Sequence, residues 1–421
     1  MQLAYRLGKN HRLNNLKLLV ENRGDRLIME ASGPGSKLFG SFIKNNFRWL
    51  NKVGPVAVQE GRNVYSLYLP PVPSEAHAHY LRNLLQTWLF HKPTPLAATI
   101  ALNYECQCNC VHCSIPSVFA KKPILSTEEV EKVVKESINL GVVHFTFTGG
   151  EPLLRDDLEI CISFVPKNEA VVQVFTNGIA VNAERAAKLK AAGLFGLIIS
   201  LDSPDPDEHD RLRNTKGCFR AAERAVRYAK EAGLLVGLST YATNQSSHEG
   251  KLTRLAALAA DWGVHEITVL DVIPTGRLIR RDDLLLTEES REILMREGRA
   301  VYKKYEGRPR IVTQTLAGSG FRGFGFTNSV GCLAGSYEFH VTAYGDFTPC
   351  DFTPLRFGNV RTEPLAQLWK KLTAHPVYCR HARKCRMQSP EFREKYIHKI
   401  PEHALLPFPI SEIETSALGG L

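Results

Sequence analysis

A repeating strand–loop–helix unit constrains the fold of this chain more than any other feature. From about residue 96 to residue 310, short apolar segments alternate with amphipathic stretches of helical periodicity. The apolar segments read LAATIALN, VVHFTFTGG, VVQVFTNG, LFGLIISLDS, LLVGLSTYATN and HEITVLDVIP. Because these six segments are almost continuously apolar, they predict strands covered on both faces, as in a parallel sheet wrapped by helices.

Local signals for helix ends agree with this pattern. Ser126 and Glu129 form a capping-box pattern before EEVEKVVKESINL, and Gly141 ends that segment. Three further glycines follow later helical segments, namely Gly193, Gly233 and Gly263. The repeat predicts an α/β fold with a partial (β/α)6 TIM-like barrel over residues 96–310. In such barrels, the loops that follow the strands carry the chemistry.

The regions on either side of the barrel differ from it in composition. Proline-rich stretches near residues 69–75 and 91–98 indicate a boundary, so residues 1–95 are expected to form an N-terminal extension of unknown role. The last part of the chain, residues 311–421, is expected to form a small cysteine-rich domain and a C-terminal tail.

The positive charge of the chain is concentrated in the N-terminal extension. Residues 1–95 contain 13 Lys and Arg against 5 Asp and Glu, within a chain of formal net charge +10. This excess indicates an anionic partner such as a membrane surface, nucleic acid or an acidic peptide, and a solubilising surface explains it equally well. The segment SKLFGSFIKNNFRWLNKV has the pattern of a basic amphipathic helix that lies on a membrane or packs against its own domain.

Membrane and export signals are absent from the sequence pattern. No apolar run has the length of a membrane span, and the N-terminus lacks the apolar core and cleavage site of a signal peptide. We therefore expect a cytoplasmic protein, with peripheral membrane contact through the basic region as an alternative. Ten cysteines in such a chain indicate metal or redox chemistry and not disulfides.

The first group of cysteines directly follows the first predicted strand. Cys106, Cys110 and Cys113 have the spacing C-x3-C-x2-C. Three thiolates suit a 4Fe-4S cluster, because a fourth iron then stays open for another ligand. With Cys108 as a fourth ligand, the same loop fits a zinc site. The spacing alone leaves both alternatives open.

Together with the loops after the next strands, this cysteine loop resembles the radical S-adenosylmethionine (radical SAM) superfamily over about residues 96–390. Its motifs match Cys106, Cys110 and Cys113, a GGEP loop of Gly149, Gly150, Glu151 and Pro152, a TNG segment of Thr176, Asn177 and Gly178, an SLD segment of Ser200, Leu201 and Asp202, and an HD-x-x-R run of His209, Asp210 and Arg213. Pro274, Gly276 and Arg277 resemble the P-x-G-R turn of the family.

The resemblance implies a cofactor chemistry. The three cysteines would hold a 4Fe-4S cluster that binds S-adenosylmethionine and cleaves it to a 5′-deoxyadenosyl radical, which takes a hydrogen atom from the substrate. Cofactor-binding roles follow for Gly149, Gly150, Glu151, Pro152, Asn177, Ser200 and Asp202. Glu151 is expected to accept from the ammonium group of the cofactor, and Ser200 and Asp202 to hold its ribose hydroxyls.

The other residues near these motifs receive simpler interpretations. The ring of His112 is expected beside the adenine. Cys108 is interpreted as a bystander, and Cys161 and Cys218 as buried core residues, since neither has a partner at metal-ligand spacing.

The second group of cysteines lies in the last quarter of the chain and consists of Cys332, Cys350, Cys379 and Cys385. A β-hairpin that turns at residues 344–346 is predicted between the first two, and LAQLWKKL predicts a helix before the last two. Four thiolates suit a second cluster or a zinc ion. The C-x(n)-G-x4-C pattern resembles SPASM and twitch extensions, which implies one auxiliary 4Fe-4S cluster that transfers electrons.

These inferences predict a radical SAM enzyme of the oxidoreductase or maturase type. Its substrate would be a peptide or a lipophilic small molecule, and an electron donor such as flavodoxin or ferredoxin would reduce it. The alternative is an iron–sulfur sensor or nucleic-acid-binding protein that uses the basic N-terminal region without catalysis. The GGEP loop favours the enzyme, and no catalytic side chain is indicated by the sequence.

Overall fold

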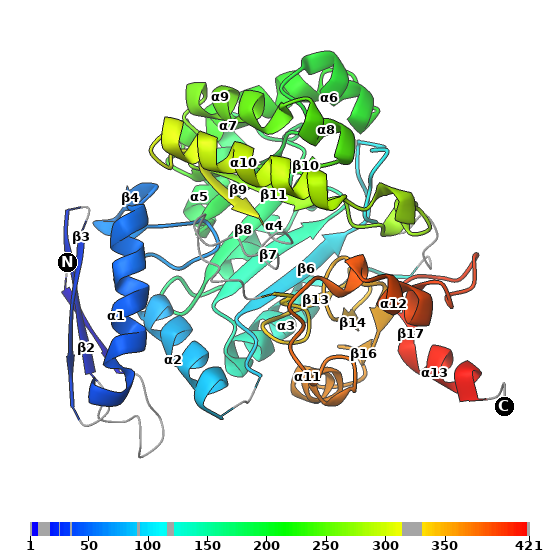
Figure 1. Cartoon of the computed structure of the whole chain (residues 1–421), viewed down its shortest axis with the longest axis horizontal. Coiled ribbons are helices and arrows are strands. Elements are labelled where there is room, and N and C mark those ends of the chain that lie inside the picture. The colour runs from blue at the N-terminus through cyan, green and yellow to red at the C-terminus, as the bar shows by residue number, and fades with distance from the viewer. Residues whose placement is uncertain are drawn as a thin grey trace.

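The central sheet of the protein lies between an N-terminal module and a C-terminal extension (Figure 1). The computed structural model describes residues 2–6, 17–24, 26–33, 36–90, 93–115, 122–313 and 331–418. The N-terminal sheet and the last helix lie at opposite ends of the molecule (Figure 1).

Most of the central sheet consists of parallel strands, and neighbouring strands follow one another in the chain. They are β6 (Ala97–Asn103), β7 (His144–Gly149), β8 (Val171–Thr176), β9 (Gly196–Ser200), β10 (Leu235–Ala242), β11 (Glu266–Asp271) and β12 (Arg310–Thr313). The strands β6 to β11 confirm the predicted set, and their order is that of a partial TIM-like barrel. The sequence pattern does not predict β12, because it has only four residues and begins with an arginine.

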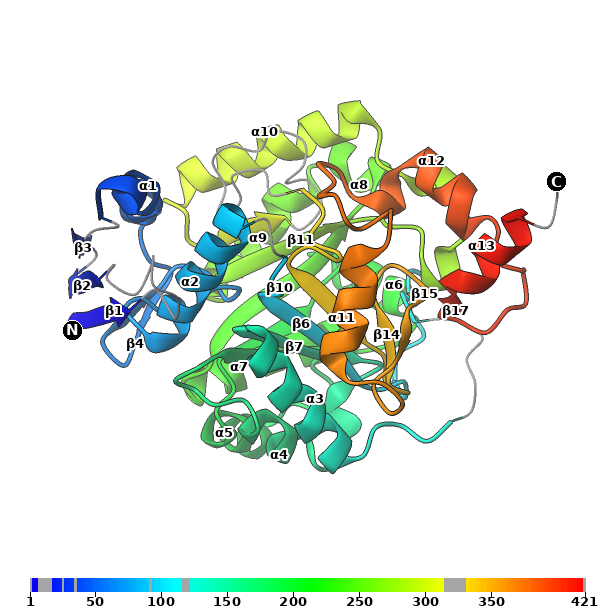
Figure 2. The same cartoon turned by 90° about the horizontal axis from the view of Figure 1, so that it is seen from below.

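Helices follow the strands and lie on the outside of the curved sheet (Figure 2). They are α3 (Thr127–Leu140), α4 (Leu158–Ser163), α5 (Ala183–Ala192), α6 (Pro206–Arg213), α7 (Cys218–Glu231), α8 (Asn244–His248), α9 (Lys251–Asp261) and α10 (Glu288–Lys304). The capping box of Ser126 and Glu129 is confirmed at the start of α3. The predicted glycines after α3, α5, α7 and α9 all adopt positive φ. Within the described ranges, no helix has the length and hydropathy needed to cross a membrane.

The C-terminal extension joins the central sheet at its other edge. Strand β13 (Glu338–Val341) pairs in parallel with β6, and β14 (Asp346–Thr348) returns antiparallel to β13. The predicted hairpin is thereby confirmed, and α11 (Leu365–Ala374) confirms the predicted helix. The remaining elements of the extension are β15 (Leu355–Arg356), β16 (Gly358–Asn359), α12 (Pro390–Phe392), β17 (Phe408–Pro409) and α13 (Ile410–Leu418).

The pairing of β13 with β6 has a physical basis in the core. Phe339 of β13 packs against Phe347 and Trp369 of the extension, with ring centroids 5.2 and 5.9 Å apart. These rings belong to the same continuous apolar core as the buried side chains of the barrel. The extension therefore shares the core of the barrel and does not form an independent one.

The N-terminal module has a small core of its own. It consists of β1 (Gln2–Arg6), β2 (Lys17–Arg23), β3 (Arg26–Ser32), α1 (Ser36–Val53), β4 (Ala57–Gln59), β5 (Arg62–Val64) and α2 (Glu75–Phe90). The C-terminal half of α1 buries Phe47 and Leu50 in this core, while Lys44, Arg48 and Lys52 are exposed. This half of the predicted amphipathic helix therefore packs against its own module. The side chains of residues 37–43 lie outside the described part of the structure.

The module closes the end of the barrel at which the parallel strands begin. Arg310, the first residue of β12, is 2% exposed and donates to three carbonyl oxygens of the N-terminal module. These carbonyls belong to Val53, Gly54 and Tyr65, at distances of 2.9, 2.8 and 2.6 Å. Glu266, the first residue of β11, accepts from the Leu67 N–H at 3.2 Å. The predicted cofactor site is therefore expected at the opposite end of the barrel, where the parallel strands end.

Candidate active site

The loops after β6 to β11 surround a cavity of about 210 Å³ at the C-terminal ends of the strands. The first group of cysteines lines it, namely Cys106, Cys108, Cys110 and Cys113. Five of the residues predicted to bind the cofactor line it as well: Gly149, Gly150, Asn177, Ser200 and Asp202. Glu151 and Pro152 lie outside this lining and are buried. The structure therefore brings most of the predicted site residues to one cavity.

The cysteine loop is held from two sides by backbone contacts. On one side, Asn109 and Val111 donate their N–H groups to the end of α6, at 3.2 and 3.0 Å. On the other side, the Arg277 N–H donates to the Cys113 oxygen at 3.1 Å. The Arg277 guanidinium also donates to the carbonyl oxygens of Asn109 and Cys110, at 3.3 and 3.2 Å. The positions of the three thiols are thus fixed by chain segments distant in sequence.

The GGEP loop lies directly against the cysteine loop. Gly150 donates to the Asn103 oxygen at 2.9 Å, and Glu151 donates its N–H to the Glu105 oxygen at 2.7 Å. A Cβ atom on Gly149 or Gly150 would overlap these same carbonyl oxygens. Only glycines allow this close approach of the two backbones, so the motif is required locally for the shape of the cavity.

The carboxylate of Glu151 lies behind the cavity lining, against Thr176 and Asn177. It is fully buried and accepts from the Thr176 hydroxyl and the Asn177 N–H, both at 2.7 Å, and from the Leu153 N–H at 3.2 Å. Burial raises its pKa to about 7, against the opposing effect of these hydrogen bonds. These contacts join the GGEP loop to the TNG segment, and the contact of Glu151 with an ammonium group stays a prediction.

Asn177 lies beside the first cysteine of the loop. Its side-chain amide donates to the Cys106 sulfur at 3.7 Å and to the Gln107 carbonyl oxygen at 3.1 Å. An amide N–H directed at a thiolate sulfur stabilises the negative charge of that sulfur. The TNG segment therefore supports the cysteine loop, in addition to lining the cavity.

Asp202 forms a buried ion pair at the edge of the cavity. Its carboxylate receives both Nε and Nη2 of Arg213, at 2.6 and 3.1 Å. Burial by itself would raise the pKa of Asp202, but the positive charge of Arg213 outweighs burial and the pKa is lowered. The Nε2 atom of His112 lies 3.5 Å from the same carboxylate. Asp202 is thus charged and pre-positioned, while Ser200 lines the cavity beside it.

The residues of the HD-x-x-R run form hydrogen bonds that hold this edge of the cavity in place. His209 is fully buried and accepts from the Asp202 N–H at 3.1 Å. Asp210 accepts from the N–H groups of Gly217 and Phe219 at 2.5 and 2.8 Å, at the start of α7. In this structure, each residue of the run therefore has a positioning contact.

Two aromatic rings in close contact, tilted by 34°, line the same cavity. The rings of His112 and Tyr241 lie with centroids 4.0 Å apart, and both residues line the cavity. Burial lowers the pKa of His112 to about 4, so the imidazole is neutral near pH 7. Its Nδ1 is buried without a hydrogen-bond partner in the described part of the chain. A neutral ring pair with one free ring nitrogen suits the packing of a planar heterocycle.

Three of the four C-terminal cysteines come together in the extension. Cys332 and Cys350 are buried, and the Cys385 thiol is hydrogen-bonded to Cys332, which lowers the pKa of Cys332. Burial raises the pKa of Cys350 well above its usual value. Cys379 instead is exposed and directs its thiol to the Pro376 oxygen at 3.3 Å. Across the described residues, no three His, Cys, Asp or Glu side chains form a single-ion site.

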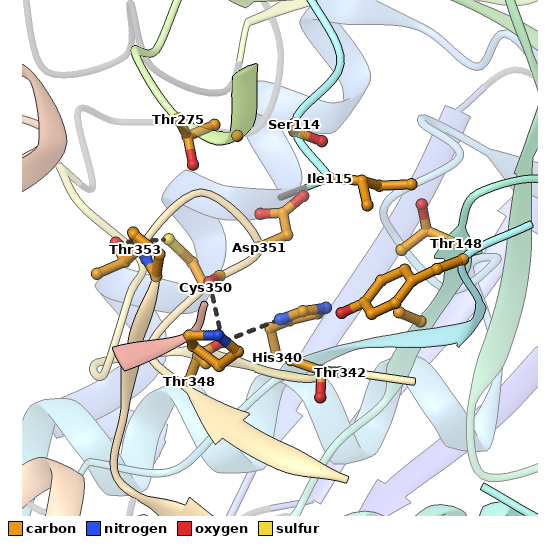
Figure 3. A pocket seen from close by; sticks show the side chains of 16 residues that line it. Ser114, Ile115, Thr148, Thr275, His340, Thr342, Thr348, Cys350, Asp351 and Thr353 are labelled. Carbon is orange, nitrogen blue, oxygen red and sulfur yellow. Dashed lines mark hydrogen bonds between the residues drawn. The ribbon is translucent and has the colours of Figure 1, made fainter. Parts of the chain in front are cut away.

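A second cavity, of about 70 Å³, lies beside Cys350 of the extension and the residues that follow Cys113. Its wall includes Cys350 and Asp351 from the extension and Tyr104 and Ile115 from the cysteine loop and its flanks. Five residues line both cavities, namely Ser114, Ile115, Thr148, Gly149 and Thr275. The two cavities are therefore neighbours with a shared wall. Figure 3 shows four of the shared residues, Ser114, Ile115, Thr148 and Thr275, around the second cavity.

Two protein-family models match the chain. The model of the radical SAM superfamily matches residues 101–255, and that of the SPASM iron–sulfur cluster-binding domain matches residues 332–393. The first match spans the cysteine loop together with the GGEP, TNG and SLD segments around one cavity. The chain belongs to the radical SAM superfamily. It is a radical SAM enzyme with a SPASM-type extension, which confirms the resemblance inferred from its motifs.

Characterised relatives of this radical SAM enzyme match most of its length. The AdoMet-dependent heme synthase of Nitratidesulfovibrio vulgaris is 27% identical over 300 residues, covering 66% of this chain and 80% of that protein. The PqqA peptide cyclase of Granulibacter bethesdensis is 26% identical over 292 residues, which cover 68% of this chain and 76% of that protein. Among solved structures, Streptococcus suis SuiB bound to its precursor peptide SuiA covers 98% of this chain and 99% of its own, with a TM-score of 0.58 and 15% identity.

These matches assign two kinds of cofactor to the chain. They are a 4Fe-4S cluster with S-adenosylmethionine in the barrel and an auxiliary iron–sulfur cluster in the extension. The residues around the first cavity fit the former group. The thiols of Cys106, Cys110 and Cys113 line it, Gly149 and Gly150 allow the close contact of the two loops, and Nδ1 of His112 is buried without a hydrogen-bond partner among the described residues.

Two features of the radical SAM site are not indicated by the motifs. Cys218 is buried as predicted, but its sulfur lies 3.9 Å from that of Cys108, so it does have a thiol neighbour. The two residues are 110 positions apart, and only the packing of α7 against the cysteine loop brings them together. The second feature is Asp351, whose carboxylate enters the second cavity. Its position directly after Cys350 is the signal that the sequence offers for it.

Proposed function

We propose that this radical SAM enzyme removes a hydrogen atom from a carbon of a peptide substrate and that the extension takes up the electron released when the substrate radical is oxidised. The observation that carries this proposal is the shared wall between the two cavities. A substrate in the second cavity would lie between the first group of cysteines and Cys350. An arrangement of this kind suits hydrogen removal on one side and electron uptake on the other.

The residues of the first cavity would hold the cofactors. In this proposal Cys106, Cys110 and Cys113 bind the 4Fe-4S cluster, and the amide of Asn177 stabilises the charge on the Cys106 sulfur. S-adenosylmethionine bound there supplies, on reduction, a carbon radical strong enough to remove hydrogen from an unactivated carbon. The protein residues orient the reactants and exclude water. The rings of His112 and Tyr241 would pack the adenine, and Ser200 and Asp202 would lie near the ribose.

In the extension, Cys332, Cys350 and Cys385 would ligate the auxiliary cluster. Their clustering supports the three assignments. Cys379 remains the proposed fourth ligand, and its exposed position requires a rearrangement of residues 376–385 on metal binding. The electron donor is expected to be a flavodoxin or a ferredoxin.

A peptide substrate is supported by two comparisons. One relative is named as a peptide cyclase, and the structure of SuiB with a precursor peptide aligns over nearly the whole chain, including the region of the N-terminal module. Hydroxyl groups line the second cavity, which favours a polar group over a lipophilic small molecule. We further propose that the basic N-terminal module binds the remainder of the peptide.

An anaerobic assay tests the proposed function. Reconstituted protein should contain about eight irons in two clusters, and reduction with S-adenosylmethionine present should yield 5′-deoxyadenosine. The cysteine triple variant Cys106→Ala/Cys110→Ala/Cys113→Ala should lose about four irons and all 5′-deoxyadenosine formation. If this variant still formed 5′-deoxyadenosine, the assignment of the first cluster would be wrong. Stoichiometric zinc in the extension would contradict the role proposed for the second cysteine group.

A further inference from the structure

The second cavity has a single acidic side chain that faces its interior. Among the described residues, the lining otherwise consists of apolar groups, glycines, a thiol, one imidazole and several hydroxyls. The hydroxyls belong to Tyr104, Ser114, Thr148, Thr275, Thr342, Thr348 and Thr353. Figure 3 shows the carboxylate of Asp351 directed into the space between these side chains. Asp351 is therefore placed to contact whatever occupies the cavity.

The turn that carries Asp351 is held rigidly. Thr348 donates its hydroxyl to the Cys350 oxygen at 3.1 Å, and Thr353 donates its N–H to the same oxygen at 3.3 Å. The Thr353 hydroxyl lies 3.2 Å from the Cys350 sulfur, and His340 Nδ1 lies 2.9 Å from the Thr348 hydroxyl. With its backbone fixed in this way, Asp351 presents the carboxylate at a defined position.

No positive group in the described lining balances this carboxylate. Neither Lys nor Arg is among these lining residues, and His340 is neutral near pH 7 because burial lowers its pKa to about 3. The described lining residues carry no cation, so the Asp351 carboxylate is open to pair with a positive group of a molecule bound in the cavity.

We propose that the second cavity takes a substrate that carries a protonated amine or a guanidinium group, and that Asp351 pairs with this cation. The pairing would hold an adjacent carbon of the substrate at the wall shared with the first cavity. This assignment rests on the proposed function and specifies its substrate class. Such a cation is found on a lysine or arginine side chain of a peptide and on a free small-molecule amine.

Binding of small probes tests the assignment without knowledge of the full substrate. The probes are Nα-acetyl-lysine amide and its uncharged counterpart Nα-acetyl-norleucine amide, together with butylamine and 1-butanol. Each is titrated anaerobically into protein that holds both clusters and S-adenosylmethionine, and ligand-observed saturation-transfer NMR reports the affinity. We expect each cation to bind at least about tenfold more tightly than its neutral counterpart. Tighter binding of the capped lysine than of butylamine would identify a peptide as the source of the cation.

Variants at Asp351 complete the test. Asp351→Asn, which keeps the shape and removes the charge, should abolish most of the preference for the cation, and Asp351→Glu should retain it. Asp283→Asn is the matched control, because Asp283 is exposed and pairs with Arg281 away from the cavity. Iron content and circular dichroism of every variant must match the wild type. The comparison of charged and neutral probes on the wild type decides the question even if Asp351→Asn loses iron.

The outcomes separate this inference from the proposed function. Equal binding of charged and neutral probes to the wild type, or an unchanged preference in a folded and iron-loaded Asp351→Asn variant, would overturn the inference. The 5′-deoxyadenosine assay is carried out on the same preparations. Its failure would contradict the proposed function, whereas 5′-deoxyadenosine formation without a cation preference would contradict only the assignment of Asp351.

Discussion

Glu266 is a buried acid in the contact between the barrel and the N-terminal module. It is fully buried at the first position of β11, where one carboxyl oxygen accepts from the Leu67 N–H and the other has no partner among the described residues. Burial raises its pKa to about 7. The folded protein therefore holds a proton on Glu266 more tightly than the unfolded chain does, for which the usual value is 4.5.

This shift predicts a pH dependence of stability. Because the folded-state pKa is raised, the contribution of Glu266 is fully present below pH 4.5 and is lost as the pH rises through about 7. The variant Glu266→Gln removes this loss, so its stability relative to the wild type should improve by up to about 1.4 kcal/mol per pH unit across that window. Urea unfolding at pH 5 and pH 7.5 measures the effect. Glu402→Gln, at an exposed position, should leave the pH dependence unchanged.

The two groups of cysteines predict different phenotypes. Cys110→Ala should abolish both 5′-deoxyadenosine and product formation, because it removes one of three proposed ligands of the first cluster. Cys350→Ala should retain slow 5′-deoxyadenosine formation, while product formation falls by about tenfold or more, since the barrel cavity is intact. Circular dichroism and iron content must show that the extension stays folded. A folded Cys350→Ala variant with the wild-type rate of product formation would mean that the second cluster is structural.

For individual residues, the sequence predicts which of them come together but not the direction of each side chain. Cys106, Cys110 and Cys113 line one cavity as expected, since a short loop after a strand leaves them no alternative. Glu151 belongs to the GGEP motif, and its carboxylate is held by hydrogen-bond donors of the adjacent TNG segment. The orientation depends on the packing of two strands, which a linear motif does not contain.

Among the elements, the loop after β11 has a structural role that its motif alone does not indicate. Residues 274–282 contact the cysteine loop through Gly276 and Arg277, and they contact the C-terminal extension through Arg393. Arg393 is fully buried and donates to the oxygens of Pro274 and Ile279 at 3.0 and 2.6 Å. One loop therefore connects the extension with the ligands of the first cluster.

This connection predicts that Arg277 positions the first cluster. Arg277→Gln removes the hydrogen bonds to Asn109 and Cys110, while the backbone bond to Cys113 remains. A loss of about 1 kcal/mol should accelerate the release of iron to a chelator about fivefold. Absorbance of the chelate under anaerobic conditions gives the rate. Arg281→Gln is the control, because that side chain is exposed and pairs with Asp283. Equal rates in both variants would show that Arg277 does not stabilise the loop.

The elements themselves were the most predictable part of the fold. Strands β6 to β11 are long apolar runs between clear helix signals, so their sequence identifies them. Strand β12 cannot be predicted in this way. Its first residue, Arg310, is stabilised by carbonyls of the N-terminal module, which lie more than 240 positions away in the sequence. The pairing of β13 with β6 is also a long-range contact and cannot be read from local periodicity.

At the scale of the whole molecule, the N-terminal module and the candidate site lie at opposite ends of the barrel. Strands of five to eight residues separate the two ends by roughly 20 Å, at about 3.3 Å per residue. If the proposed peptide contacts both the module and the cavities, it must be long enough to reach around the barrel. An extended peptide meets this requirement, and a compact molecule does not.

The charge of the module predicts a salt-dependent interaction. Changing Lys44, Arg48 and Lys52 to Gln, together with Lys37, should weaken binding to an acidic peptide or to anionic vesicles by about 1 kcal/mol per charge at low salt. The loss should shrink as the salt concentration rises. Fluorescence anisotropy and vesicle sedimentation measure the two cases, and 5′-deoxyadenosine formation without substrate should not change. If neither interaction weakened, the basic face would serve solubility alone.

The parallel pairing of β13 with β6 has a consequence for how this protein can be divided. Strand β6 leads directly into the cysteine loop, and β13 is its neighbour on the side away from β7. A chain shortened before β13 would therefore leave the backbone N–H and C=O groups of β6 without partners along one side. Exposed strand edges of this kind promote association between copies. The extension therefore cannot be removed without exposing β6. A shortened version of the enzyme would have to keep the β13–β14 hairpin, which covers this edge of the sheet.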